Sequence, residues 1–134
     1  MTDFSLKIVT PDGVKFEGNA QELVVRTITG DMGILAGHTN CVAPLGMGTA
    51  TIVADGQKRY AACIGGMVSV MDGVVTLVPT TFEWAEEIDE IRARSAQERA
   101  ERILADKKAS AEELSLAEAK LKRALIRQSV AGRK

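Results

Sequence analysis

The chain has 134 residues, of which 46% are hydrophobic and 26% are charged, so it is expected to fold in water as one domain or as a small domain with an appendage. The formal net charge of -1 and the pI of about 5.9 exclude the broad basic surface that binds nucleic acid, so no nucleic acid partner is expected. No apolar run approaches the ~20 residues of a membrane helix, and residues 1–7 lack the apolar stretch of a signal peptide, so we expect an intracellular chain without direct membrane insertion.

Glycine, proline and charge divide the chain near residues 83–87. Eleven of the twelve glycines and all three prolines lie at or before Pro79. Residues 1–84 carry 13 charged side chains, whereas residues 85–134 carry 22. The composition therefore predicts two domains of different architecture, a β domain over residues 1–84 and a helical domain over residues 85–134.

The first domain has the pattern of short strands joined by tight turns. Asp-Gly dipeptides at residues 12–13, 55–56 and 72–73 separate apolar runs and indicate hairpin turns. The runs alternate or are rich in β-branched residues; they include Leu6 and Ile8 and residues 23–25, 49–53, 60–64, 67–71 and 74–78. Such strands over about 80 residues predict a β-sandwich or barrel, in which each strand buries one face.

Cysteine, histidine and motif content argue against a metal site or an enzyme. Cys41 and Cys63 lie in apolar surroundings outside any C-x-x-C pair, so we expect two buried, reduced thiols. With His38 as the single histidine, a zinc site has too few ligands, and no metal or required cofactor is expected. Walker-type and G-x-G-x-x-G loops are absent, and no nucleophile–base set is evident, so no activity of its own is expected.

The second domain predicts an antiparallel pair of helices. Asp89 is a candidate N-cap with Ile88 and Ala93 as a hydrophobic staple across it, and Ser110 with Glu113 has the spacing of a capping box for a second helix. The expected apolar stripes are Ile91, Ala96, Ala100, Ile103 and Leu104 on the first helix, and Leu114, Ala117, Leu121, Ala124 and Leu125 on the second. Residues 106–110 interrupt the pattern, so two helices of ~20 residues, each about 30 Å long, should pack side by side.

The expected stripes are rich in alanine, which allows close approach but buries little area. At ~0.8 kcal/mol per buried methylene-sized group, an alanine seam is weaker than a leucine seam. The hairpin is therefore expected to fold but to be only modestly held together, so that a partner or ligand can shift its conformation.

Residues 30–38, Gly-Asp-Met-Gly-Ile-Leu-Ala-Gly-His, resemble the fingerprint loop of the epsilon subunits of bacterial F-type ATP synthases. The family pattern is roughly G-x-x-G-[IV]-[LMY]-[PA]-G-H. The Gly65-Gly66 step, the hairpin at residues 72–73 and a two-helix tail that begins Ile88-Asp89-x-x-Arg92-Ala93 also fit. The resemblance extends from residue 3 to residue 131, and the order and spacing of these motifs make it specific.

The resemblance implies an α+β protein, a ten-stranded β-sandwich followed by a helical hairpin. In the family the sandwich docks on the gamma subunit and on the polar loops of the membrane c-ring, which implies a peripheral location on the cytoplasmic side of the cell membrane. The hairpin either lies folded or extends along gamma into the α/β catalytic hexamer, where it blocks ATP hydrolysis. The implied function is a non-catalytic rotor subunit of the central stalk that couples ATP synthesis to ion transport.

The resemblance also assigns contact residues on the sandwich. Asp31, Met32 and Gly33 are implied to approach the c-ring loops, where Asp31 pairs with a basic loop residue; Asp31 lies between two glycines in an apparent turn. His38 is implied to contact gamma. The alternatives are an ordinary turn residue for Asp31 and a hydrogen-bonded loop residue for His38.

In some bacterial members the folded hairpin binds one ATP through the motif I/L-D-x-x-R-A and basic residues of both helices. The residues that correspond here are Glu83, Ile88, Asp89, Arg92, Ala93, Arg99, Arg123 and Arg127. Arginine forks suit phosphate oxygens, and an aspartate can accept hydrogen bonds from ribose or adenine. Such a site without a magnesium pocket would sense ATP as a regulatory ligand without hydrolysing it. The alternative is that Asp89 only caps its helix and that the arginines are solvated.

The last helix is basic, and the resemblance implies that it contacts the catalytic β subunits when the hairpin is extended. The residues concerned are Lys120, Lys122, Arg123 and Arg127. A solvated basic face is the alternative. Since Arg123 and Arg127 cannot bind ATP and a β subunit together, the two states should compete.

Two other functions are open to the same fold. A carbohydrate- or ligand-binding sandwich with a helical oligomerisation tail would need aromatic platforms and a leucine seam, whereas aromatics make up 4% of this chain and its stripes are rich in alanine. A small enzyme would need a nucleophile and base that the sequence does not offer.

Overall fold

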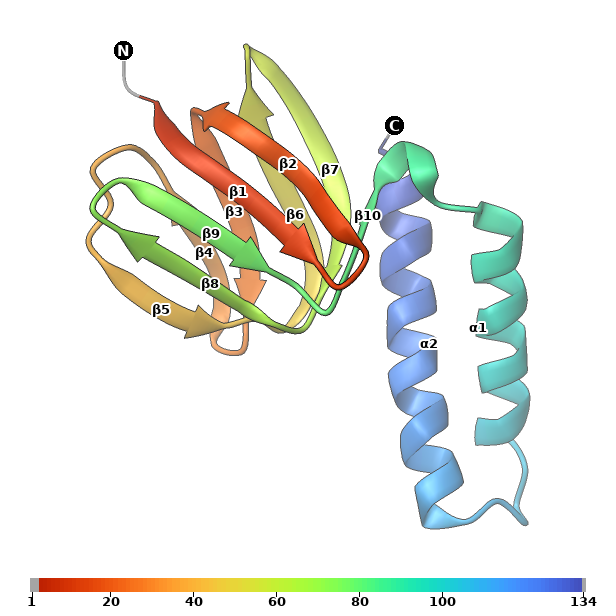
Figure 1. Ribbon diagram of the computed structural model, residues 1–134. Helices are drawn as coiled ribbons and strands as arrows, with labels where there is room; N and C mark the ends of the chain where they lie inside the picture. Colours follow the sequence, from red (N-terminus) through yellow and green to blue (C-terminus); the bar gives the residue numbers. More distant parts are fainter. Residues whose placement is uncertain (1–2, 134) are drawn as a thin grey trace. The chain divides into compact units, whose positions relative to one another are not determined.

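The computed structural model describes residues 3–133, which divide into two compact units between Trp84 and Ala85. The first unit contains ten β-strands, and the second contains a short 3-10 helix and two α-helices (Figure 1). The expected fold class, a two-sheet β-sandwich followed by two packed helices, is confirmed.

The ten strands form two five-stranded sheets. Sheet A has the order β2 (Gly13–Ala20), β1 (Phe4–Thr10), β9 (Val74–Val78), β8 (Met67–Met71) and β5 (Cys41–Pro44). Sheet B has the order β10 (Thr81–Trp84), β7 (Gln57–Ile64), β6 (Met47–Ala54), β3 (Glu22–Thr27) and β4 (Gly30–Ile34). Neighbouring strands are antiparallel except β1 and β9, which are parallel.

Alternation along the strands sends one face of each sheet into a shared core. In sheet A, the fully buried side chains are Leu6, Ile8, Val68, Val70, Val75 and Leu77; in sheet B they are Leu23, Val25, Ile34 and Ile52. Each such aliphatic side chain contributes about 1.5–3 kcal/mol when it leaves water. The period-2 pattern of the sequence is therefore what holds the two sheets together.

Two of the three Asp-Gly dipeptides form the expected hairpin turns. Asp55 and Gly56 both have positive φ, 52° and 73°, as do Asp72 and Gly73, 50° and 82°, which is the type I′ pattern that suits a two-residue hairpin. At residues 12–13 the expected turn is shifted, because Gly13 (φ 125°) already pairs with Thr10 as the first residue of β2.

Gly66 illustrates why a glycine is required between β7 and β8. Its φ is 95°, and a Cβ there would collide with the carbonyl oxygen of Val78. Its own carbonyl accepts a hydrogen bond from the Leu45 N–H at 2.8 Å. The close approach of these chain segments therefore depends on the missing side chain.

The helical unit consists of η1 (Ala85–Glu87), α1 (Glu90–Leu104) and α2 (Ala111–Ala131). Asp89 caps α1 by accepting the Arg92 N–H at 3.0 Å. Ser110 and Glu113 form the complete capping box expected at the start of α2. With 15 residues, α1 is shorter than the ~20 residues predicted, because it starts at the Asp89 cap and ends at Leu104.

The two helices pack through a seam of alanines. The buried seam residues are Ala93 and Ala100 on α1, and Ala117 and Ala124 on α2. Three larger residues predicted for the stripes are instead exposed: Ile91 by 78%, Ile103 by 39% and Leu125 by 46%. Ile91 lies two residues before Ala93, about 200° around the helix, so a seam centred on alanine turns it outward.

Candidate functional site

The alanine seam has a different chemical character on each flank. On one flank the Gln128 amide donates to the Gln97 side-chain oxygen at 2.6 Å, which joins α2 to α1. Gln97 follows Ala93 by four residues, and Gln128 follows Ala124 by four residues. Equivalent offsets from the seam therefore meet on the same flank of this antiparallel pair (Figure 1).

The same reasoning places four arginines on the other flank. Arg92 and Arg99 each precede a seam alanine by one residue, as does Arg123 on α2. Arg127 follows Ala124 by three residues, about 60° from the seam on the side of Arg123. We call this set, Arg92, Arg99, Arg123 and Arg127, the arginine flank.

The Gln97–Gln128 bond also fixes the level of these arginines along the hairpin. Since residue 97 is level with residue 128, Arg99 lies within about 1.5 Å of the level of Arg127 along the axis. Arg123 is about one turn away, and Arg92 is about 10 Å from Arg99 toward the start of α1. Arg92, Arg99 and Arg123 are exposed, and Arg127 is half-buried.

The other predicted nucleotide contacts have different surroundings. Ile88 and Ala93 are buried to 4% and 0% exposure, as a staple across the Asp89 cap requires, so they position the start of α1. One carboxylate oxygen of Asp89 is used by the cap. Glu83 lies on β10 of the sandwich unit, opposite Ala62, so its approach to the hairpin stays a prediction.

The two lysines predicted to contact the catalytic subunits are both exposed. Lys120 precedes Ala124 by four residues and so lies on the same side of α2 as the arginine flank. Lys122 lies two residues before Ala124, about 200° from the seam, and faces away from α1. The basic surface of α2 therefore extends from the arginine flank to the outer face of the hairpin.

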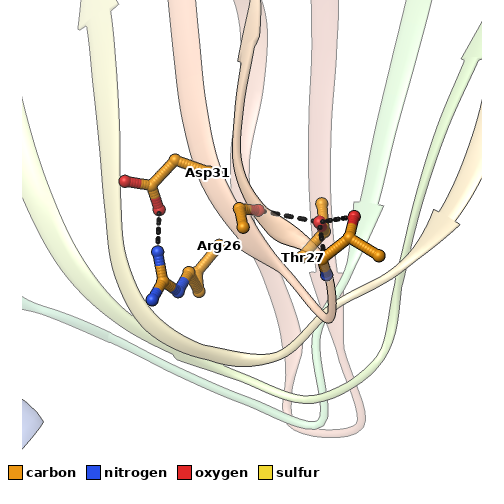
Figure 2. Close-up of polar contacts among 5 residues, drawn as sticks. Arg26, Thr27 and Asp31 are labelled. Carbon is orange, nitrogen blue, oxygen red and sulfur yellow. Dashed lines mark hydrogen bonds and ion pairs between the residues drawn. The ribbon is translucent and has the colours of Figure 1, made fainter.

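Asp31 is in a strand and not in the turn that the sequence suggested. Residues 28–29 form the loop, and Gly30 (φ 126°) pairs with Thr27 to close it. Asp31 is thus the second residue of β4, opposite Arg26 on β3, and its Oδ1 accepts a hydrogen bond from Arg26 Nη1 at 3.2 Å (Figure 2). Its carboxylate already has an internal cationic partner.

The two residues after Asp31 differ in exposure. Met32 is half-buried and packs against the core of the sandwich. Gly33 is exposed, and a Cβ added there would meet no atom within 4 Å. Gly33 therefore allows another backbone to approach closely, whereas Met32 is mainly held by the sandwich itself.

His38 lies in the loop that connects β4 of sheet B to β5 of sheet A. Its N–H donates to the Leu35 carbonyl at 3.1 Å, and Gly37 supplies the positive φ of 84° that this turn needs. Its Nδ1 lies 2.8 Å from the Thr39 carbonyl oxygen. The loop is further tied to the β8–β9 turn, because the Asp72 N–H donates to the Asn40 side chain at 2.8 Å.

The outer face of sheet A is an apolar surface that the residue-level reasoning did not single out. Its exposed side chains, which we call the apolar face, are Val42, Met67, Met71, Val74 and Val78. Two cross-strand pairs, Met67 with Val78 and Met71 with Val74, bring them together. The signal was available in β8 and β9, where apolar residues occupy positions on both faces of the sheet.

Aromatic side chains are not exposed on the sandwich. Phe4, Phe82 and Trp84 are buried, and Phe16 and Tyr60 are half-buried. Trp84 packs edge-on against Phe82 and lies under the Arg59 guanidinium at 3.7 Å. The stacking platform that a carbohydrate-binding module needs is therefore missing from residues 3–133.

Membrane-spanning helices and metal sites are both missing from the part of the chain that the structure describes. Within residues 3–133, neither helix is long and apolar enough to cross a membrane. The same residues contain no cluster of three or more His, Cys, Asp or Glu side chains with metal-binding geometry. Cys41 and Cys63 are free, and burial raises the pKa of the Cys63 thiol to about 12, so Cys63 is a poor thiolate ligand.

Comparison with known families decides between the candidate functions. Residues 3–85 match the beta-sandwich domain of the ATP synthase Delta/Epsilon chain, and residues 86–132 match its long alpha-helix domain. The chain belongs to this family. The resemblance to F-type epsilon subunits is thereby confirmed, and the chain is a non-catalytic subunit of an ATP synthase.

Curated relatives support this over the full length. The chain is 42% identical over 135 residues to the ATP synthase epsilon chain of Ruminococcus albus, with 100% of both chains covered. It is 40% identical over 131 residues to the epsilon chain of Caldicellulosiruptor bescii, covering 98% of this chain and 95% of that one.

Two solved structures of low sequence identity share the fold of this chain. A chain in the Euglena gracilis mitochondrial ATP synthase structure, described as OSCP/F1/c-ring, superimposes with a TM-score of 0.85 at 24% identity and covers 100% of this chain and 83% of that chain. A chain in the Tetrahymena thermophila mitochondrial ATP synthase central stalk/c-ring structure gives a TM-score of 0.62 at 13% identity and covers 95% of each chain.

Proposed function

We propose that this chain is the central-stalk rotor subunit of a bacterial F-type ATP synthase, and that its hairpin restrains ATP hydrolysis and senses ATP. The sandwich would connect gamma to the polar loops of the c-ring and so couple the catalytic head to ion transport. Partners of this kind would hold the chain peripherally at the cytoplasmic side of the cell membrane. The convergence of the arginine flank from two helices is the observation that carries the sensing part of the proposal.

The apolar face of sheet A supports docking on gamma. Its five side chains are between 42% and 60% exposed, and aliphatic side chains and methionines supply area without charge. An exposed apolar patch of this kind commonly marks a protein interface. His38 lies in the loop that leads into β5, which carries Val42, so the histidine and the apolar face could contact one partner.

Substitution on the apolar face provides the docking test. Val74→Asp should weaken the association of the full chain with its gamma subunit by at least tenfold, because a charge would be buried in an apolar contact. Thr51→Asp, on the opposite outer face of the sandwich, is the matched control. Equal effects of the two substitutions would mean that gamma does not dock on the apolar face.

The arginine flank supports binding of a polyphosphate. The exposed guanidinium groups of Arg92, Arg99 and Arg123 on one side of the folded hairpin repel one another, and a bound anion would reduce that repulsion. Arginine donates to phosphate oxygens in a planar, bidentate geometry. The Asp89 oxygen that is not used by the helix cap could accept from ribose or adenine at the end of α1 where Arg92 lies.

ATP and a catalytic β subunit would compete for the same side chains. Arg123 and Arg127 belong to the arginine flank, and together with Lys120 and Lys122 they make α2 basic. Bound ATP would add about 2.7 kcal/mol to the folded hairpin when its concentration is ~100 times the dissociation constant. With plentiful ATP the hairpin would stay folded, and with scarce ATP it would be available to block hydrolysis.

Calorimetric titration of the full chain with ATP tests the sensing role. Arg99→Ala and Arg123→Ala, one from each helix, should each weaken binding by about 10- to 100-fold, the range for a charged hydrogen bond of 1.5–3 kcal/mol. Arg94→Ala is the matched control, because Arg94 is exposed on α1 but follows Ala93 by one residue and so lies on the opposite flank, where Gln97 and Gln128 meet. Wild-type affinity in both flank variants would mean that ATP does not bind there.

A further inference from the structure

The end of the sandwich at the β3–β4 hairpin is a rigid structure. Thr27 Oγ1 donates to the Gly30 carbonyl at 2.7 Å and accepts from the Thr29 N–H at 3.2 Å (Figure 2). The Ile28 N–H donates to the Pro44 carbonyl at 3.2 Å. The hairpin is thus fixed both within itself and to Pro44 at the end of β5, so its side chains are presented in defined positions.

Arg26 lies beside two glycines, Gly46 just before β6 and Gly48 within it. A Cβ at Gly48 would stand 2.6 Å from Arg26 Cβ and 3.0 Å from Arg26 Cγ, and a Cβ at Gly46 would stand 3.7 Å from Arg26 Cγ. The Gly46 N–H also donates to the Arg26 carbonyl at 2.9 Å. The two glycines therefore leave room for the arginine stem to lie against the sheet and direct its guanidinium toward Asp31.

The Arg26–Asp31 pair is exposed, and its one internal contact uses only part of its hydrogen-bonding capacity. The Arg26 and Asp31 side chains are 51% and 65% exposed, and one Nη1–Oδ1 contact at 3.2 Å joins them. Within residues 3–133, this contact leaves the remaining guanidinium N–H groups and Asp31 Oδ2 able to bond a partner. The hairpin end thus offers donors and an acceptor side by side while its local charge sums to zero.

We propose that Arg26 belongs to the docking surface for the c-ring, and that the Arg26–Asp31 pair is recognised as one neutral donor–acceptor unit by a polar loop of a c subunit. The proposal rests on the proposed function, which assigns this end of the sandwich to the c-ring. It replaces the expectation that Asp31 meets a basic loop residue as a lone acid. Because Asp31 is already paired with Arg26 at 3.2 Å, a second cation would add little binding free energy. Hydrogen bonds from the exposed pair to polar groups of the partner become stronger when the contact excludes water.

The test measures binding of the full chain, in complex with its gamma subunit, to the purified c-ring of the same ATP synthase at low and high salt. Arg26→Met keeps the stem but removes the charge. It should weaken binding by at least tenfold and make binding more sensitive to salt, because the Asp31 charge is uncovered. Asp31→Asn should also weaken binding, and the double substitution should cost less than the product of the two single effects. Arg26→Lys, which keeps charge without the fork, should give an intermediate affinity.

The contrary results separate the inference from the proposed function. If Arg26→Met leaves c-ring binding unchanged or tightens it, Asp31 acts as a lone acid and the inference is wrong, while c-ring docking stands. If Arg26→Met weakens binding without changing the salt dependence, Arg26 has a structural role only and the inference is again wrong. If the wild-type complex does not bind the c-ring, both the inference and the assignment of this surface fail.

Discussion

The hydrogen bond between Gln97 and Gln128 controls how firmly the two helices of the hairpin are held together. It joins α1 to α2 at 2.6 Å beside a seam whose buried residues are alanines. A neutral hydrogen bond contributes about 1 kcal/mol net, and truncating one partner leaves the other without its bond in a half-buried site. Gln128→Ala should therefore favour opening of the hairpin by about 1 kcal/mol, or roughly fivefold.

Amide hydrogen exchange under native conditions measures that opening directly. The amides of α1 and α2 should exchange about fivefold faster in Gln128→Ala, while the amides of β6 and β7 in the sandwich should not change. Ser129→Ala is the control, because Ser129 is the next residue on α2 and is exposed. In the double variant with Gln97→Ala, the effect should be less than the sum of the two single effects. Unchanged exchange in Gln128→Ala would refute the view that this bond holds the helices.

Three further outcomes follow from local chemistry. Gly66→Ala should lower the free energy of unfolding by about 3 kcal/mol, because both the φ of 95° and the Val78 carbonyl oppose a Cβ at this position. Gly56→Ala should lower it by only about 1 kcal/mol, because the space around Gly56 is open. Urea denaturation followed by Trp84 fluorescence distinguishes the two variants. Burial raises the pKa of Cys63 from 9.0 to about 12, so the unfolded chain loses this proton first and stability should fall by roughly 1 kcal/mol between pH 8 and pH 10. Cys63→Ala should remove that part of the slope, and identical slopes would contradict the burial argument. Asp89→Ala should destabilise α1 by about 1 kcal/mol, whereas Asp89→Asn should preserve the helix cap. Weaker ATP binding in Asp89→Asn would therefore show that Asp89 contacts the ligand. Unchanged binding would show that Asp89 only caps the helix.

Local signals in the sequence predicted the parts of the fold that depend on local chemistry. The Asp55-Gly56 turn and the Ser110–Glu113 capping box need only nearby residues, and both form as expected. Strands β4 and β5 could not be found from pattern alone, because Gly30–Ile34 contains two glycines and Cys41–Pro44 ends in a proline. Their pairing with β3 and β8 makes them strands, and pairing over long sequence distances is not written in the residues themselves.

The hairpin shows where hydrophobic periodicity misleads. Helical spacing allowed a buried stripe through either Ile91 or Ala93 but not through both, and hydrophobicity favoured the isoleucine. The structure buries Ala93 and exposes Ile91 by 78%, because small side chains let the helices approach closely along one line. Once the seam is known to run through alanine, the positions of the arginines and glutamines follow from their spacing.

The sequence did not predict how the candidate contact residue Asp31 is paired within the sandwich. The glycine-rich segment indicated that Asp31 lies near a loop, yet its bond to Arg26 depends on the β3–β4 register. A shift of one residue in that register would send the two side chains to opposite faces of the sheet. The resemblance implied an acidic contact at Asp31, and the register shows that this acid is paired with Arg26.

The regulatory role of the hairpin is tested most directly by ATP hydrolysis in the ATP synthase assembled from its own subunits. The measurement compares the full chain with a chain that lacks residues 88–134, which retains the ten strands of the sandwich. We predict that the truncated chain still assembles with gamma and the c-ring, and that hydrolysis rises, most of all at low ATP. Equal hydrolysis with the full and truncated chains would contradict a restraining role for the hairpin.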